Sequence, residues 1–204
     1  MTLTNQWNRL RYRLYAPVYD ALARPLERGR RRAVERLDPR PDDRVLIVGC
    51  GTGSDLAYIP DGASVVAVDL TPAMVRRTAD RDGVRYCEVA LGDAHRLPFR
   101  DDAFDAVILH LVLSVVPDPD AVVTETARVL APDGRVSLYD KFSPEAGDPS
   151  LARRVANPVA RLLFADLNRS RAPMVADTGL EVGRRETLLG GLYTVTTARP
   201  TADG

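Results

Sequence analysis

Short stretches rich in apolar residues, bounded by Gly, Pro and Asp, recur through the middle of the chain. The apolar, often β-branched composition of these stretches is typical of strands buried inside a sheet. Between two of them, Thr71 followed by Pro72 has the sequence of a helix N-terminus, and residues 118–130 indicate a second helix. The alternation predicts one α/β domain. The predicted strands are residues 45–48, 65–68, 84–89, 104–110 and 136–140.

The first predicted strand runs directly into three glycines, Gly49, Gly51 and Gly53, and then into the first turn of a predicted helix. Glycine suits a backbone that turns tightly or approaches a ligand closely. The helix N-terminus behind it offers free N–H groups. Asp69 ends the second predicted strand, where an acidic side chain can bind the two hydroxyls of a ribose. Together these features predict a cofactor that carries a nucleoside.

The spacing of the glycines indicates which kind of cofactor this is. A dinucleotide fingerprint has glycine at its first, third and sixth positions, but here the sixth position is Ser54. The G-x-G-x-G pattern instead resembles motif I of the class I S-adenosylmethionine-dependent methyltransferases. Taken alone, the pattern also fits an ordinary glycine-rich turn between a strand and a helix.

Further segments resemble the same family in the same order. Residues 92–99 are similar to its G-D-A-x-x-L-P-F segment, residues 104–107 to F-D-x-V, and residues 131–135 to the stretch that precedes the fifth strand. The resemblance implies a Rossmann-like α/β fold with a seven-stranded, mostly parallel sheet of order 3-2-1-4-5-7-6. It also implies S-adenosylmethionine as the cofactor. The expected cofactor-binding residues are Gly49, Cys50, Gly51, Thr52, Gly53, Asp55, Asp69, Leu70, Met74, Asp93, Ala94 and His110.

One position departs from the family. An acidic residue usually stands two positions before the first glycine, where it helps to hold the amino-acid part of the cofactor, and here that position is Ile47. Asp55 is the nearest candidate to replace this acid. Its other interpretation is a first-turn residue favoured by the helix dipole. The loss of the acid also leaves open a binding module without catalysis, although Asp69, Asp93 and the three glycines argue against it.

Charge is distributed unevenly along the chain, although 28 basic and 28 acidic residues give no net charge. Residues 1–37 carry nine arginines against three acidic residues, interleaved with Trp7, Tyr12, Tyr15 and Tyr19. Such a segment can bind an anionic membrane surface, or it can be the solvated face of a helical cap. The expected organisation of the single domain is a helical cap at 1–37, a cofactor-binding core at 44–141, a basic helical insert at 142–178 and a C-terminal β-hairpin at 179–199.

The chain also resembles the bacterial phosphatidylethanolamine N-methyltransferases. The resemblance is carried by A-P-V-Y-D at residues 16–20, G-R-R at 29–31 and H-L-V-L-S-V-V-P at 110–117. It implies methyl transfer to the amine of phosphatidylethanolamine and its methylated derivatives, with a phospholipid in an anionic membrane surface as the partner. The alternative is a soluble small molecule or a quinone precursor, because other methyltransferases share these motifs. Tyr19, His110 and Tyr12 are the candidate catalytic residues for handling the proton of the amine.

Other function classes are disfavoured. No apolar run is long enough to span a membrane, and the first residues do not have the pattern of a signal peptide. The two cysteines are expected roughly 9–10 Å apart, with the second strand between them, too far for a disulfide. We therefore expect a cytoplasmic protein, which a phospholipid acceptor would place peripherally on the inner membrane face. The His and Cys residues lack metal-ligand spacing. No added basic domain or base-flipping motif predicts a nucleic-acid substrate, and the oligomeric state is not determined.

Overall fold

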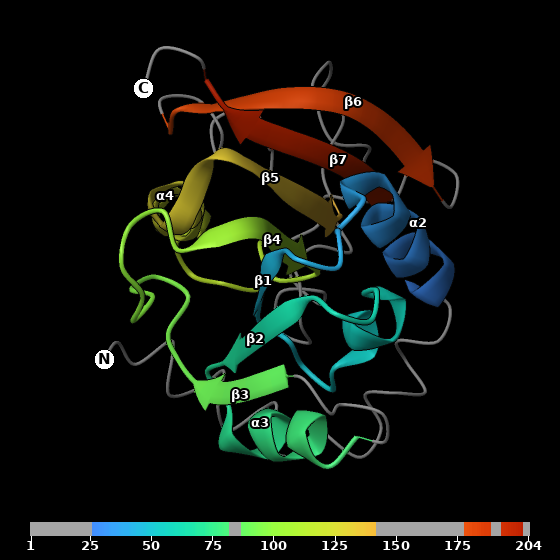
Figure 1. The fold of residues 1–204 in the computed structure, drawn as a ribbon, viewed down its shortest axis with the longest axis vertical. Helices are drawn as coiled ribbons and strands as arrows, with labels where there is room; N and C mark the ends of the chain where they lie inside the picture. The colour runs from blue at the N-terminus through green and yellow to red at the C-terminus, as the bar shows by residue number, and fades with distance from the viewer. Residues whose placement is uncertain (1–25, 82–86, 142–177, 189–192, 202–204) are drawn as a thin grey trace, which may run out of the picture.

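A computed structural model describes residues 26–81, 87–141, 178–188 and 193–201 of the chain. Its described strands form one seven-stranded sheet of order β3-β2-β1-β4-β5-β7-β6, which confirms the expected topology (Figure 1). The strands are β1 (Arg44–Val48), β2 (Ser64–Asp69), β3 (Cys87–Leu91), β4 (Phe104–His110), β5 (Leu130–Asp140), β6 (Leu180–Leu188) and β7 (Tyr193–Pro200). The helices are α2 (Glu27–Leu37), the 3₁₀ helix η2 (Ser54–Tyr58), α3 (Pro72–Ala79) and α4 (Pro119–Val129).

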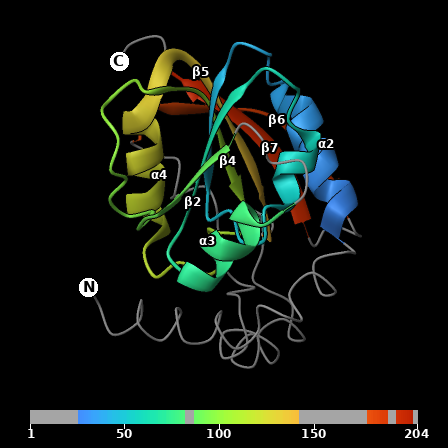
Figure 2. The same ribbon diagram turned by 60° about the horizontal axis from the view of Figure 1, so that its bottom comes forward.

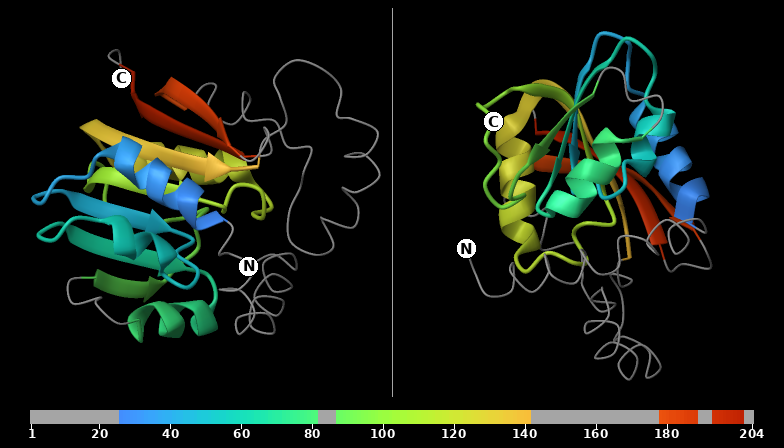
Figure 3. Two further views of the ribbon diagram at one scale, coloured as in Figure 1. Left: turned by 90° about the vertical axis from the view of Figure 1, so that its right-hand side faces the viewer. Right: turned by 90° about the horizontal axis from the view of Figure 1, so that it is seen from below.

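Helices cover both faces of the sheet, with α2 and η2 on one side and α4 on the other (Figures 2 and 3). Successive side chains of a strand point to opposite faces of the sheet. Because both faces are covered, all side chains of β1 after Arg44 are buried. Leu46 and Val48 pack in the cluster that includes α4, while Val45 and Ile47 pack with Val34 and Leu37 of α2. Ile47, where the family usually has an acid, is therefore a core residue that is 1% exposed.

The parallel and antiparallel parts of the sheet meet at β5. The strand pairs β3–β2, β2–β1, β1–β4 and β4–β5 are parallel. β7 is antiparallel to both β5 and β6. The carboxyl ends of the parallel strands therefore lie at one edge, which is where ligands bind in sheets of this kind. The glycine-rich loop follows β1 at this edge.

Some local expectations were wrong in detail. The helix expected after the glycine-rich loop is present, but it is the short 3₁₀ helix η2. Pro60 follows Ile59, and a residue before proline is driven into extended backbone, so the helix ends there. β5 begins at Leu130, directly after α4, and includes the expected turn at 131–135. Its register with β4 shifts between Phe104 and Ala106, which accommodates the extra residues as an irregularity of the ladder.

Candidate cofactor site

The glycine-rich loop turns sharply at the end of β1. Gly49 has φ of 68°, a conformation that favours glycine, and a Cβ there would lie 2.7 Å from Cγ2 of Val112. The backbone N–H of Cys50 donates to the Val68 carbonyl of β2 at 2.9 Å, which ties the start of the loop to the neighbouring strand. The loop is thus brought close to the segment that follows β4, and the two form facing walls of a pocket.

Asp69, at the end of β2, faces this pocket. One carboxylate oxygen accepts the backbone N–H of Gly51 at 2.9 Å, and the other accepts the N–H of Thr71 at 2.8 Å. Burial raises the pKa of Asp69, and these two hydrogen bonds only partly offset it. Each oxygen of an ionised carboxylate can accept a further hydrogen bond. The carboxylate is therefore fixed in place and can still bind two hydroxyls of a ligand.

Seven of the predicted cofactor-binding residues come together around one pocket at the carboxyl edge of the sheet. These are Gly49, Gly51, Asp69, Leu70, Met74, Asp93 and Ala94. The rest of the wall was not predicted from the sequence. It consists of Val68, Thr71, Gly92, His95, Leu111, Val112, Val115, Val116 and Pro117. The segment 110–117 had been noted for its family resemblance, and that was the signal by which its place in the pocket could have been found.

Asp93 and His95 form one unit of the pocket wall. Oδ1 of Asp93 lies 2.6 Å from Nδ1 of His95 and 3.0 Å from its backbone nitrogen. Because a carboxylate oxygen only accepts, Nδ1 carries the hydrogen. Burial alone would raise the pKa of Asp93, but the hydrogen bonds from His95 outweigh it and hold the pKa below its usual value. Asp93 is thus kept ionised at the rim of the pocket.

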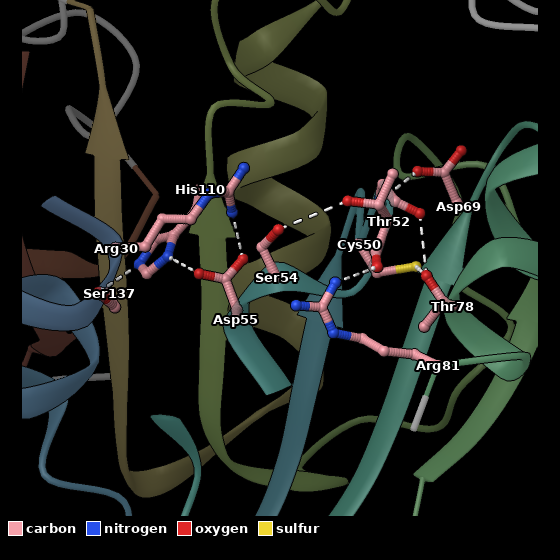
Figure 4. A network of polar contacts seen from close by, with 11 residues as sticks. Arg30, Cys50, Thr52, Ser54, Asp55, Asp69, Thr78, Arg81, His110 and Ser137 are labelled. Carbon is pink, nitrogen blue, oxygen red and sulfur yellow. Dashed lines mark hydrogen bonds and ion pairs between the residues drawn. The ribbon is translucent and has the colours of Figure 1, made fainter. Parts of the chain in front are cut away.

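Asp55 and His110 occupy a different place from the one predicted. Neither contributes to the pocket wall. Asp55 is 2% exposed and forms an ion pair with Arg30 of α2, while its Oδ1 lies 2.6 Å from Nδ1 of His110 (Figure 4). Nε2 of His110 lies 2.8 Å from Oγ of Ser137 on β5. Both imidazole nitrogens of His110 are therefore engaged inside the protein, so this side chain is not placed to take a proton from an acceptor.

Asp55 lies in the first turn of η2, as one of the two interpretations from the sequence held, but its contacts are not those that either interpretation expected. It does not face the pocket, and its partners are side chains instead of the free N–H groups of a helix end. Burial alone would raise the pKa of Asp55, but the charges and hydrogen bonds of Arg30 and His110 outweigh it and lower the pKa. The partner that the sequence analysis missed was Arg30. Its position in the G-R-R motif does not indicate that its side chain is buried.

The remaining predicted residues of the loop support its shape from behind. Cys50 and Thr52 are buried, and Gly53 is held by an N–H bond to the Cys50 carbonyl. Burial is the main cause that raises the pKa of the Cys50 thiol to about 12, so this cysteine is not activated as a nucleophile. Both cysteines are free, as expected. On the side of α3, Thr78 and Arg81 donate to the carbonyls of Gly51 and Thr52 (Figure 4).

Several predictions fall on other parts of the chain. Tyr12 and Tyr19 lie outside the described residues, as do most of the expected cap and the basic insert.

Among the residues that the structure describes, no group of His, Cys, Asp and Glu side chains could hold a metal ion. Within the same part of the chain, no helix combines the length and apolar character needed to cross a membrane.

Comparison with known proteins places this site in a family. Residues 46–138 match the family model described as a methyltransferase domain, Methyltransf_11. Phosphatidylethanolamine N-methyltransferase of Cereibacter sphaeroides is 30% identical over 185 residues, which cover 87% of this chain and 90% of that protein. Demethylmenaquinone methyltransferase of Renibacterium salmoninarum is 32% identical over 207 residues, covering 87% and 85%. The chain therefore belongs to the class I S-adenosylmethionine-dependent methyltransferases.

Other similarities are more partial or concern the fold alone. Nocamycin O-methyltransferase of Saccharothrix syringae is 35% identical over 155 residues, which cover 71% of this chain, and the chain spans only about half of that protein, 53%. A Haloferax volcanii protein solved in complex with the Trm112 methyltransferase activator superposes with a TM-score of 0.79 at 19% identity, covering 95% of this chain and 97% of that one. Geranyl diphosphate methyltransferase in complex with S-adenosylmethionine gives a TM-score of 0.73 at 18% identity, covering 86% and 85%. S-adenosylmethionine is the cofactor of this family.

Proposed function

We propose that the protein transfers methyl groups from S-adenosylmethionine to the amine of phosphatidylethanolamine and its methylated derivatives at a membrane surface. The observation that carries this proposal is the similarity to the Cereibacter sphaeroides enzyme over 90% of that enzyme's length. It extends well beyond the cofactor-binding core at residues 46–138, which many methyltransferases have in common. The similarity to the Renibacterium salmoninarum enzyme extends beyond the core as well. The A-P-V-Y-D and G-R-R motifs at residues 16–20 and 29–31, which resemble the phosphatidylethanolamine enzymes, therefore favour the phospholipid acceptor.

The chemistry requires little from the protein beyond alignment and exclusion of water. The lone pair of the amine attacks the methyl carbon, so that a C–N bond forms while the C–S bond breaks and S-adenosylhomocysteine leaves as a neutral sulfide. The positive charge moves from sulfur to nitrogen, and the new ammonium loses a proton before the next transfer. Asp69 and Asp93 would hold the nucleoside, while Leu111, Val112 and Val116 form an apolar wall that keeps water out.

Removal of the proton from the amine is assigned to residues outside the described part of the chain. A protonated ethanolamine head group has no lone pair to attack with, so the site needs a base or a desolvating environment. Because both nitrogens of His110 are engaged by Asp55 and Ser137, Tyr19 and Tyr12 remain the candidates. Their role stays a prediction.

The membrane part of the proposal depends mostly on the arginines that precede α2. Within α2, Arg31 pairs with Glu35, while Arg32 and Arg36 pair with Glu186 of β6. These arginines have part of their charge compensated within the protein. We therefore expect the attraction to an anionic leaflet to come mainly from Arg9, Arg11, Arg13 and Arg24, together with Arg28, which is exposed in α2.

A quinone precursor is the second candidate acceptor, favoured by a specific similarity. The Renibacterium salmoninarum relative and a Thermus thermophilus relative, 39% identical over 154 residues, are both demethylmenaquinone methyltransferases. Such an acceptor is methylated on carbon and also dissolves in lipid. A whole-lipid extract would therefore not distinguish the two proposals, and defined acceptors are needed.

The deciding experiment supplies methyl-labelled S-adenosylmethionine with three defined acceptors. These are vesicles of phosphatidylethanolamine with an anionic lipid, phosphatidylcholine vesicles containing demethylmenaquinone, and a pool of soluble metabolites. We expect label in mono-, di- and trimethylated ethanolamine lipids, separated by chromatography, and much less label with the Asp69→Ala variant when the cofactor concentration is near the wild-type Kd. Label in the quinone or in the soluble pool alone would replace the proposal by one of its alternatives.

Membrane binding is tested separately by flotation with vesicles. The full-length protein should bind vesicles containing anionic lipid more tightly than neutral ones, and binding should fall steeply with salt because screening weakens each arginine contribution of about 1 kcal/mol. Deletion of residues 1–11 should reduce activity on vesicles more than it reduces affinity for the cofactor. A full-length protein that ignores anionic vesicles at low salt would make a soluble acceptor the better hypothesis.

A further inference from the structure

A closed ring of buried polar contacts joins helix α2 to the cofactor loop and back again. Arg30 of α2 pairs with Asp55, Asp55 bonds to His110 at the end of β4, and His110 bonds to Ser137 of β5. Oγ of Ser137 lies 3.2 Å from the carbonyl of Ala33, which returns the ring to α2. Arg30 and Asp55 are 4% and 2% exposed. The ring thus connects four separate elements without reaching solvent.

Stability alone does not account for charges in this place. Removing two charges from water is costly, and apolar residues of similar volume often stabilise a core equally well or better. One documented use of buried charges is to fix a particular arrangement of elements.

The ring holds two opposite walls of the cofactor pocket. Asp55 comes two residues after Gly53, and the N–H of Leu56 bonds to the Gly53 carbonyl at 3.2 Å, so η2 and the glycine-rich loop form one continuous turn. On the other side, His110 is followed by Leu111, which lines the pocket. A hydrogen bond between Asp55 and His110 therefore sets the spacing between the loop and the end of β4.

Helix α2 contributes no residue to the wall of the pocket, although the Arg30 side chain reaches the ring. The other polar side-chain contacts that the loop makes with neighbouring elements involve Asp69 of β2, Thr78 of α3 and Arg81, which follows α3. The contacts of Asp55 with Arg30 and His110 hold η2, where the chain leaves the glycine-rich loop and the pocket. Docking of α2 and the shape of the pocket are linked through one arginine.

We propose that Arg30 is a positioning residue for cofactor binding, which holds the glycine-rich loop and the end of β4 at their binding distance through Asp55 and His110. Binding of the cofactor and docking of α2 then favour each other, because each stabilises the same arrangement of the ring. The proposal concerns the cofactor half of the reaction and holds whether the acceptor is a phospholipid or another molecule.

Calorimetric titration with S-adenosylhomocysteine tests the affinity. Arg30→Met and Asp55→Asn should each raise Kd at least tenfold, measured well below the melting temperature of each variant. Arg30→Lys keeps the charge and should recover part of the affinity, and the Arg30→Met, Asp55→Asn double variant should lose no more than either single one. Arg31→Met is the matched control, since Arg31 lies on the exposed side of the same helix and should leave Kd within twofold. A merely structural Arg30 would lower the melting temperature and leave Kd of the folded protein unchanged.

Hydrogen exchange of the wild-type protein provides a test that needs no variant. S-adenosylhomocysteine should slow exchange of the amides of α2 more than that of residues 125–129 in α4, which lie on the opposite face of the sheet (Figure 2). Arg30→Met should abolish this extra protection. Equal protection of both helices in the wild type, or a Kd within twofold of the wild type in both Arg30→Met and Asp55→Asn, would overturn the proposal. If Arg30→Met does not fold, Asp55→Asn, Arg30→Lys and the wild-type exchange decide the matter.

Discussion

Two aspartates lie near the carboxyl ends of neighbouring strands, Asp69 at the end of β2 and Asp55 in η2 after β1, and they have opposite environments. Asp69 is held by backbone N–H groups of Gly51 and Thr71 and faces the pocket. Asp55 is enclosed by the side chains of Arg30 and His110 and does not reach the pocket. Burial raises the pKa of Asp69, whereas the two basic partners lower the pKa of Asp55 despite its burial.

The difference shows how partners decide what a buried carboxylate can do. Backbone N–H groups fix Asp69 without neutralising its charge, so the charge remains available to a ligand. Arg30 neutralises Asp55, and the pair then acts as an internal connection between elements. On this basis we propose that Asp69 binds the cofactor and that Asp55 supports the arrangement of the elements around the pocket.

The largest expected effect is on stability, from Asp55→Ala. This change leaves Arg30 and His110 buried without their anion, and breaking a buried ion pair costs about 3–5 kcal/mol. Urea unfolding should detect the loss directly. Asp105→Ala is the control, because its partner Arg44 is 42% exposed and partly exposed ion pairs contribute less, about 0–1 kcal/mol. Similar losses in the two variants would contradict the distinction drawn for Asp55.

A somewhat smaller effect is expected on cofactor affinity, from Asp69→Ala. Loss of a charge-assisted contact to two hydroxyls should cost on the order of 2–3 kcal/mol of binding free energy, roughly 30- to 150-fold in Kd. Calorimetric titration with S-adenosylmethionine measures it, with Asp61→Ala, three residues before β2, as the control. Nicotinamide dinucleotides should bind neither variant nor the wild type. Unchanged affinity in Asp69→Ala would remove the assignment of this residue to the cofactor.

The packing of α2 beside the buried ring gives the third prediction. A Cβ on Gly29 would lie 2.2 Å from the Tyr139 hydroxyl oxygen, and Tyr139 is fully buried. Gly29→Ala should therefore push α2 from its site and cost about 1–3 kcal/mol, the range for overpacked cores. Thermal unfolding checks this, with Arg28→Ala at the exposed neighbouring position as the control. If the ring depends on the docking of α2, Gly29→Ala should also weaken cofactor binding, which the control should not do.

The fold was largely predictable from the sequence, because apolar strands and a glycine-rich turn are local signals. The pattern located β1, β2 and β4, and the family resemblance implied the strand order that the structure confirms. The errors were at junctions. Pro60 limits η2 to a few residues, and the turn at 131–135 became part of β5 through a shift in register with β4. Such shifts depend on the neighbouring strand and are not visible in a local pattern.

The site was predictable where it consists of residues near the glycine-rich loop and the strand ends. Seven predicted residues meet at the pocket because the carboxyl ends of parallel strands share an edge. The roles of Asp55 and His110 were not predictable, since they depend on Arg30, which lies 25 residues before Asp55 in the sequence. A buried arginine in a helix with several exposed arginines has no distinguishing sequence signal.

The smallest expected effect, and the most specific test of the comparison, is opposite pH dependence in Asp55→Asn and Asp69→Asn. The pKa of Asp55 falls from 3.8 to about 2, so its ionisation adds stability that is fully present above about pH 4 and is lost as the pH falls toward 2. The pKa of Asp69 is raised, so its contribution is greatest below 3.8 and is lost as the pH rises through the folded-state pKa. In urea unfolding across this acid range, the stability advantage of the wild type over Asp55→Asn should therefore grow with pH. The advantage over Asp69→Asn should shrink with pH. Slopes of the same sign in both variants would mean that the two carboxylates do not differ in the way that their partners indicate.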